Sequence, residues 1–378
     1  MKIENFISYE QPTNYIVHSD QYTKDGQIPV LTAGQSFVLG YTDEEDGIYT
    51  GEPVVIFDDF TTSVQYVDFP FKVKSSAMKI LKNKQNANIK FCYYLLSWLQ
   101  KMPPNHKRQW ISTTSQIDVN LPPIEWQKKI VQKIEAVSNI IKYRKEELKK
   151  LDELVSARFV EMFGDPVNNE KGWIKAHMGD YMTLLTDFSS NGSYKTLDSG
   201  VTMYDEPNYA WMVRTTDLES GDMTSIKYID ESAYELLSKS KIYGGELIMN
   251  KIGSAGKIYL MPQINMPASL GRNAFMFRYD ERINVKFLYH LLTSEYGQRE
   301  IQQYVRGAVT KTITKNDARA VLIIVPPIEL QNEFEIFVEQ VNKSKVVVSA
   351  NIVYNIKRIK TEFINYCLMS YSVGGILW

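Results

Sequence analysis

Two segments of the chain carry the same narrow apolar stripe at helical spacing. Apolar residues recur at intervals of three, four and seven between residues 130 and 159, and again between residues 334 and 363, while charged residues fill the other positions of the first segment. The pattern predicts two long helices, over residues 121–165 and 325–370, each spanning roughly 50–60 Å. The two stripes consist of Ile130, Ile134, Val137, Ile141, Leu148, Leu151, Val155 and Phe159, and of Phe334, Val338, Val341, Val348, Ile352, Ile356, Ile359 and Phe363.

Both predicted helices begin with the same short motif. LPPIEWQ at residues 121–127 and VPPIELQ at residues 325–331 share Pro-Pro-Ile-Glu-x-Gln, and 204 residues separate them (326 − 122). The second proline suits the first helical position, where its missing N–H is not needed, and the glutamate is favourable in the first turn. Gly164, followed by Asp165-Pro166, is a strong stop for the first helix. The shared motif, length and phase favour an internal duplication.

A narrow apolar stripe of this length must be covered, and the other copy is the nearest available partner. We therefore expect the helices to pair as a coiled coil, either parallel or antiparallel. The alternative, two core helices of one globular domain, fits less well with their length and with the charge on their other faces. The residues predicted to make the pairing are Ile134, Val137, Ile141, Leu148, Val155, Val338, Val341, Val348, Ile352 and Ile359.

The region before each helix predicts a mixed domain. Short β-like runs, such as those at residues 52–60 and 245–253, precede a short helical pattern at residues 91–99 and 287–295. The expected fold class is α+β, with two mixed α/β domains separated by two long paired helices in a pseudo-two-fold internal repeat. The expected boundaries are 1–120 for the first domain, 121–165 for the first helix, 166–324 for the second domain, 325–370 for the second helix and 371–378 for a tail.

Composition excludes several classes of protein. A chain of 378 residues with 44% hydrophobic content can bury one or more cores. Two cysteines and four scattered histidines provide neither a disulfide framework nor a zinc site, so no metal is expected. There is no signal-peptide pattern and no run of 18 apolar residues, so we expect a soluble cytoplasmic protein with no membrane partner.

The distribution of charge points to an anionic partner although the net charge is only −1. Between Asp68 and Asp118 the chain has nine basic residues and no acidic one, and a smaller gap without carboxylates lies between Glu246 and Asp280. Lysines and arginines without counter-charges are what phosphate neutralisation requires. The alternative interpretation is a solvated lysine-rich face.

One pair of carboxylates has the residue types of a metal-dependent nuclease. Asp58 and Asp59 follow an apolar strand-like run, and lysines come further along the chain. A nuclease needs such carboxylates to converge on a metal, for which the sequence provides only composition. A turn at the end of a strand is the simpler interpretation.

Over nearly its whole length the chain resembles the specificity subunits of type I restriction-modification systems. The resemblance rests on the two ends of the first helix, LPPIEWQKKIVQKI (121–134) and LVSARFVEMFGDP (154–166), and on WMVRTTDLESGDM (211–223), IMNKIGSAGKIYLMP (248–262) and GAVTKTITKNDARAVLIIVPP (307–327). It implies a subunit without catalysis of its own, in which each target-recognition domain reads one half of a split DNA site and the helices set the spacing.

The resemblance also implies partners. The helices would dock two modification (methyltransferase) subunits, which bring S-adenosylmethionine and methylate adenine, and restriction subunits that use ATP would join them. No cofactor is expected in this chain; S-adenosylmethionine, ATP and Mg²⁺ are expected in the partner subunits. The tail YCLMSYSVGGILW (366–378) departs from the ending of the first helix, so the docking surface there can differ.

The residues themselves indicate which positions contact double-stranded DNA. Lysines beside hydroxyls suit phosphates, an arginine next to an asparagine suits base edges in the major groove, and glycine-rich loops allow close approach. The predicted DNA-binding residues are Lys72, Lys74, Ser75, Ser76, Lys79, Arg214, Asn250, Lys251, Ser254, Arg272, Asn273, Thr310, Lys311, Thr314 and Lys315.

Three hypotheses follow. The first is the non-catalytic DNA-reading subunit of a methyltransferase and endonuclease complex. The second is a stand-alone nuclease that uses Asp58 and Asp59. The third is an orphan DNA-binding coiled-coil protein with no enzyme partner.

Overall fold

The computed structural model describes residues 1–32, 36–84, 86–100 and 107–367, and its chain divides into two compact units. Unit 1 consists of residues 1–147 and 348–378, and unit 2 of residues 148–347. Neither the first nor the second predicted helix forms a body of its own, because each long helix contributes one part to each unit.

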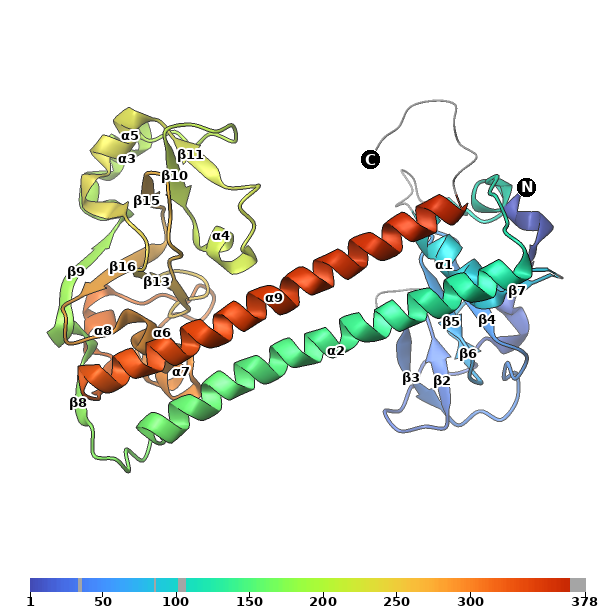
Figure 1. Ribbon diagram of the computed structural model, residues 1–378, viewed down its shortest axis with the longest axis horizontal. Helices are drawn as coiled ribbons and strands as arrows, with labels where there is room; N and C mark the ends of the chain where they lie inside the picture. Colours follow the sequence, from blue (N-terminus) through green and yellow to red (C-terminus); the bar gives the residue numbers. More distant parts are fainter. Residues whose placement is uncertain (33–35, 85, 101–106, 368–378) are drawn as a thin grey trace. The chain divides into compact units, whose positions relative to one another are not determined.

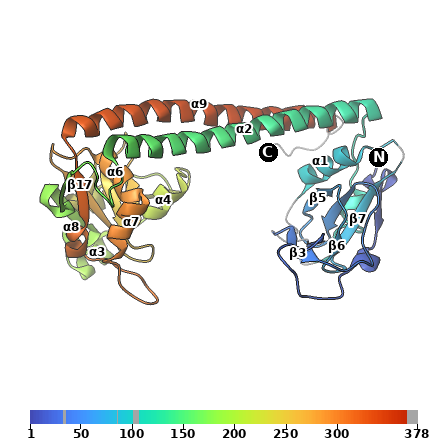
Figure 2. The same ribbon diagram turned by 90° about the horizontal axis from the view of Figure 1, so that it is seen from below.

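The described residues of unit 1 form two sheets, with strand orders β1-β7-β4-β5 and β3-β2-β6. In the smaller sheet, β2 is antiparallel to β3 and parallel to β6. Helix α1 packs on the larger sheet, where Phe91 and Leu95 share a buried cluster with Val55 and Leu81 (Figure 2). The elements are β1 (Ile7–Glu10), β2 (Ile28–Leu31), β3 (Val38–Thr42), β4 (Val54–Asp58), β5 (Val64–Val67), β6 (Lys72–Val73), β7 (Met78–Asn83) and α1 (Ile89–Leu99).

Unit 2 contains sheets with strand orders β14-β13-β16-β9 and β11-β10-β15-β12, and a short pair of strands, β17-β8. Helices α6 and α7 pack on the first sheet, and α3 and α5 pack on the second (Figure 1). The strands are β8 (Ile174–His177), β9 (Met182–Asp187), β10 (Ala210–Val213), β11 (Lys227–Ile229), β12 (Lys241–Ile242), β13 (Leu247–Asn250), β14 (Ile258–Leu260), β15 (Ala268–Leu270), β16 (Ala274–Tyr279) and β17 (Leu322–Val325). The helices are α3 (Tyr194–Gly200), α4 (Thr215–Ser220), α5 (Glu231–Leu236), α6 (Val285–Thr293), α7 (Glu295–Gln302) and α8 (Lys315–Ala320).

The two units repeat one topology. The order β1-β7-β4-β5 in unit 1 corresponds to β9-β16-β13-β14 in unit 2, strand for strand along the chain. Likewise β10, like β2, lies between an antiparallel neighbour, β11, and a parallel one, β15. These matches confirm the predicted mixed α/β fold class and its internal repeat.

The two predicted long helices are present as α2 (Ile124–Phe163) and α9 (Ile328–Cys367), each beginning directly after its second proline. In unit 2 the last part of α2 lies against the first part of α9: Arg158 and Glu333 form an ion pair at 3.0 Å, and Asp152 pairs with Lys345. In unit 1 the first part of α2 lies against the last part of α9. The helices are therefore antiparallel, which settles the alternative that their sequences left open.

The apolar stripes cover the paired faces. Val155, Phe159, Phe334, Val338 and Val341 are buried in one cluster of unit 2, in which the rings of Phe159 and Phe334 meet edge to face at 5.4 Å. In unit 1, Ile130, Ile134 and Phe363 are buried together, and Ile359 packs against them. Val348 is buried, and Val137, Ile141, Leu148 and Ile352 are half-buried. The stripe prediction was wrong at Ile356, which is 39% exposed because it lies at the margin of the helix face.

The glutamine of the repeated motif is fully buried in both copies and explains part of the repetition. In unit 1, Gln127 accepts a hydrogen bond from the backbone N–H of Asn88, the N-cap of α1, and donates to the carbonyl oxygens of Asn86 and Pro122. Gln331 makes the same bonds in unit 2, accepting from Asn284 and donating to Arg282 and Pro326. Each glutamine thus ties the start of a long helix to the start of the short helix before it.

Candidate nucleic-acid interface

Most of the predicted contact residues of unit 2 lie along one edge of its sheets. Strands β13 and β9 end, and β16 begins, at the same edge, because β16 is antiparallel to both neighbours: Asn250 pairs with Ala274, and Asp187 with Phe275. The parallel strands β10 and β15 end next to each other, with Val213 opposite Leu270. The loops that leave these ends carry Arg214, Lys251, Ser254, Arg272 and Asn273.

A third loop joins this edge by backbone hydrogen bonds. The N–H of Gly253 donates to the carbonyl oxygen of Lys311 at 2.9 Å, and the N–H of Ile313 donates to that of Lys251 at 3.0 Å. Residues 310–315 therefore extend along the segment that follows β13. Thr310, Lys311, Thr314 and Lys315, predicted from a separate part of the sequence, are thus brought to the same place as Lys251 and Ser254.

An acidic residue that the sequence analysis missed organises the lysines. The Asp187 carboxylate lies 2.9 Å from the ammonium groups of both Lys251 and Lys315, and it also accepts from the Ser190 hydroxyl at 2.7 Å. Burial raises the pKa of Asp187, but the hydrogen bonds from the two lysines and the serine outweigh this effect and lower the pKa to about 2. The group stays ionised, and the cluster of two ammonium groups and one carboxylate keeps a net positive charge. In the sequence, the only indication of Asp187 was its place as a carboxylate at the end of an apolar strand pattern.

Four side chains on this edge are exposed and have no hydrogen-bond or ion-pair partner within the described part of the chain: Ser254, Asn273, Thr310 and Lys311. Asn273 has a positive φ of 67° and directly precedes β16. Asparagine is tolerated in this left-handed conformation better than most residues. Exposed donors and acceptors of this kind can bond to base edges or phosphates without first breaking a protein contact.

The two arginines of the edge are partly engaged. Arg272 lies over the ring of Phe188 at 4.8 Å and pairs with Asp198, with 38% of its side chain exposed. Arg214 forms an ion pair with the buried Asp217, whose carboxylate also accepts from the N–H of Arg214 at the start of α4. Both guanidinium groups are therefore held in defined positions at the surface.

Two other residues of unit 2 that were predicted to contact DNA, Asn250 and Thr314, have side chains that bond within the protein. Asn250 is 7% exposed and donates to the Tyr259 hydroxyl, so its amide belongs to the core of the sheet edge. Thr314 caps α8, with its hydroxyl accepting from the N–H of Asp317 and donating to the Asp317 carboxylate. Its hydroxyl is already used inside the protein.

In unit 1 the structure contradicts the surface role of two lysines. Lys72 is fully buried and pairs with Glu44 at 2.6 Å, and Lys79 is 1% exposed and pairs with Asp59 at 3.4 Å. An ammonium group in these positions neutralises a carboxylate of the protein rather than a phosphate. Only Lys74, Ser75 and Ser76, in the turn between β6 and β7, are exposed as predicted.

The carboxylates of the nuclease hypothesis have structural partners. Asp59 is 1% exposed and accepts hydrogen bonds from the backbone N–H groups of Gln109 and Trp110. Asp58 accepts from the N–H of Phe60 and from the Thr61 hydroxyl, as a turn at the end of a strand does. The cluster of potential metal ligands found among the described residues contains neither of them and consists of His18, Glu44 and Asp46.

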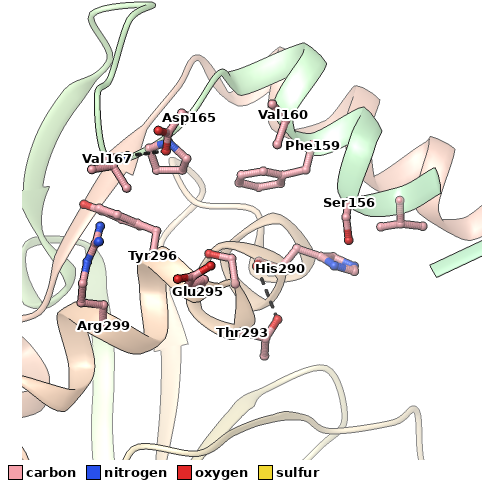
Figure 3. A pocket seen from close by; sticks show the side chains of 13 residues that line it. Ser156, Phe159, Val160, Asp165, Val167, His290, Thr293, Glu295, Tyr296 and Arg299 are labelled. Atoms are coloured by element: carbon pink, nitrogen blue, oxygen red, sulfur yellow. Dashed lines mark hydrogen bonds between the residues drawn. The ribbon is translucent and has the colours of Figure 1, made fainter. Parts of the chain in front are cut away.

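A hollow of about 430 Å³ in unit 2 lies between the end of α2, the turn after it, and α6 and α7 (Figure 3). Phe159, Asp165, His290 and Arg299 are among the residues that line it. Burial, followed by the charge of Lys345, lowers the pKa of His290 to about 4, so its imidazole is neutral at pH 7. With its ring edge-on to Phe334 at 5.3 Å, His290 packs against the apolar core around the helix pair.

The chain is similar to proteins of one known family. The chain is 32% identical over 323 residues to the specificity subunit of the type I restriction enzyme EcoR124I/EcoR124II of Escherichia coli, which covers 78% of this chain and 74% of that protein. The chain belongs to the specificity subunits of type I restriction-modification systems. The family model for the type I restriction modification DNA specificity domain matches residues 3–153 of this specificity subunit.

Two solved structures share the fold of this specificity subunit. The S subunit of a type I restriction-modification system from M. genitalium superposes with a TM-score of 0.56 at 13% identity, over 96% of this chain and 93% of that one. A chain from a structural study of complex assembly in the type I system has the same TM-score at 16% identity, over 96% and 94% of the two chains.

A specificity subunit is the non-catalytic member of its system: it recognises a DNA sequence and assembles with the other subunits. Within the described residues, no helix combines the length and the apolar character needed to span a bilayer.

Proposed function

We propose that the two units of this specificity subunit each read one half of a bipartite DNA target, and that α2 and α9 set the number of base pairs between the halves. The observation that carries the proposal is the internal repeat: both units have the same strand topology and the same glutamine junction with a long helix. A chain that contains the same DNA-recognition fold twice can bind two short sites on one DNA duplex, one with each copy.

In unit 2 the reading surface is the edge that carries Ser254, Asn273, Thr310 and Lys311. Its exposed amide and hydroxyls suit base edges and its ammonium groups suit phosphates. In unit 1 the reading surface includes Lys74, Ser75 and Ser76, which are exposed between β6 and β7. The buried Lys72 and Lys79 are not part of it.

The helices have a second role in this proposal. They dock two modification subunits, which bring S-adenosylmethionine and methylate adenine, and restriction subunits that use ATP and Mg²⁺ complete the complex. Exposed apolar residues on the long helices, including Tyr143 at 66% and Val346 at 68%, provide area for such contacts. No cofactor is assigned to this chain itself.

Sequencing DNA methylation in cells that carry the gene with that of its modification subunit tests the proposal. We expect methylated adenines within one split motif, two defined half-sites around a gap of fixed length. A continuous motif would contradict the proposal that each unit reads a separate half of the target.

The two alternatives have their own tests. Site-specific cutting of a plasmid by the pure chain with Mg²⁺ would support the nuclease hypothesis. A chain that never co-purifies with a modification subunit would support the orphan DNA-binding protein.

A further inference from the structure

The hairpin at residues 306–312 has an unusual tip. Val309 is 98% exposed, and no other large apolar side chain of the described residues is exposed to that extent. It lies between α7 and α8, in a loop that projects from unit 2 (Figure 2). An isolated exposed valine needs no explanation by itself, but this one stands on the edge that carries the predicted DNA contacts.

The hairpin is held rigidly at its base. Arg306 and Thr312 exchange two backbone hydrogen bonds, of 2.9 and 2.7 Å, and Gly307 takes a φ of 107° that other residues rarely adopt. The Arg306 guanidinium also pairs with Asp317 at 3.0 Å, at the start of α8. A side chain on a hairpin fixed in this way loses little conformational freedom on binding.

The neighbours of Val309 are basic or polar. Lys311 is exposed without an ion-pair partner within the described residues, Arg306 is 73% exposed, and the Thr310 hydroxyl is exposed. The base of the hairpin adjoins Lys251, which belongs to the cluster around Asp187. Positive charge on both sides of an apolar tip fits a groove bordered by phosphates, and the major groove of B-DNA admits a two-stranded ribbon.

We infer that the hairpin enters the major groove of the target half read by unit 2, and that Val309 reads a thymine through its C5-methyl group. In the major groove this methyl is the apolar feature that distinguishes thymine, and small apolar side chains contact it. Val309 is thus a specificity-determining residue, while Lys311 and Arg306 place the hairpin against phosphates. The inference rests on the proposed function.

The test uses the full chain together with its modification subunits. The preferred duplex is first selected from a random pool, and each of its thymines is then replaced in turn by uracil, which lacks the methyl group. We expect one replacement to weaken binding by the wild type about fourfold, the effect of burying one methyl less. Val309→Ala should bind the thymine duplex about fourfold more weakly than the wild type and lose nothing further at that one uracil.

Ile174→Ala is the matched control, because Ile174 is a β-branched side chain that is 68% exposed on β8, outside the hairpin. It should respond to uracil as the wild type does. The inference is overturned if the selected site contains no thymine, if Val309→Ala binds like the wild type, or if Val309→Ala and the wild type respond equally to every uracil. A pool that yields no preferred duplex at all would instead contradict the proposed function.

Discussion

Replacing Asp187 with asparagine should destabilise unit 2 and remove part of its dependence on pH. Asp187 is 6% exposed and accepts hydrogen bonds from Lys251, Lys315 and Ser190, and its pKa falls from 3.8 to about 2. Since one pKa unit corresponds to about 1.4 kcal/mol, the ionised carboxylate stabilises the folded state by about 2 kcal/mol at neutral pH. Because the folded pKa lies below the unfolded one, this contribution is complete above about pH 5 and is lost as the pH falls towards 2.

Urea unfolding at pH 7 and at pH 3 measures the effect, and hydrogen exchange of the β9 and β13 amides assigns it to unit 2. Asp187→Asn should lower the free energy of unfolding by about 2 kcal/mol at pH 7 and by clearly less at pH 3. Asp198→Asn is the control: it removes the exposed partner of Arg272 and should cost at most about 1 kcal/mol. A variant at Asp187 that is as stable as the wild type at pH 7, or equally destabilised at both pH values, would refute the reasoning.

Three further variants concern polar side chains, of which Lys72 and Gln331 are buried and Lys74 is exposed. Lys72→Met should cost about 3 kcal/mol, because it leaves Glu44 without its buried partner, yet it should leave the salt dependence of DNA binding unchanged in fluorescence titrations. Lys74→Gln should do the opposite, reducing the slope of log K against log salt by about 0.9 with little effect on stability; equal slopes for the two variants would contradict this assignment. Gln331→Leu should lower the stability of unit 2 by about 2–4 kcal/mol, because it leaves the N–H of Asn284 and two carbonyl oxygens unsatisfied, and a loss below about 0.5 kcal/mol in urea unfolding would show that the junction is not needed.

The long helices could be predicted because their signals are local. The stripe, the double proline and the stop at Gly164 lie within a few turns of the positions they determine, and both helices begin where the motif placed them. Their antiparallel direction could not be predicted, because a stripe is equally apolar in both directions. Contacts between distant residues, such as Arg158 with Glu333, decide it.

One physical reason explains why Lys72 and Lys79 are buried although the sequence predicted them at the surface, while Lys74 is exposed. A stretch without acidic residues indicates unpaired lysines only if no carboxylate approaches from elsewhere in the chain. Glu44 and Asp59 both do so, from 28 and 20 positions before the lysines that they neutralise (72 − 44 and 79 − 59). Lys74 points outwards between two short strands and has no such partner among the described residues.

The sequence also could not predict that the loops of unit 2 converge. Lys251 and Lys315 are 64 residues apart in the chain (315 − 251), and they meet because each bonds to the carboxylate of Asp187. Asp187 itself lies outside both stretches without carboxylates. A search for basic residues alone therefore could not find the acid that positions them.

The length of the helices provides the most direct test of the central claim, that two reading units are spaced by α2 and α9. Removing residues 138–144 from α2 and 349–355 from α9 takes seven residues, or about 10.5 Å, from each helix. In an antiparallel pair, the numbers of residues that face each other have a constant sum, which is 493 for Phe159 and Phe334 (159 + 334). The two deleted segments face each other in this register, because 138 + 355 and 144 + 349 also equal 493. Leu148 then occupies the place of Ile141 in the stripe, and Ile359 that of Ile352.

Sequencing methylated DNA from cells that carry this double deletion with the modification subunit is the decisive measurement. Since B-DNA rises about 3.4 Å per base pair, we predict the same two half-sites around a gap shorter by about three base pairs. A folded, methylating variant that keeps the original gap would contradict the account and would leave the helices with a docking role alone.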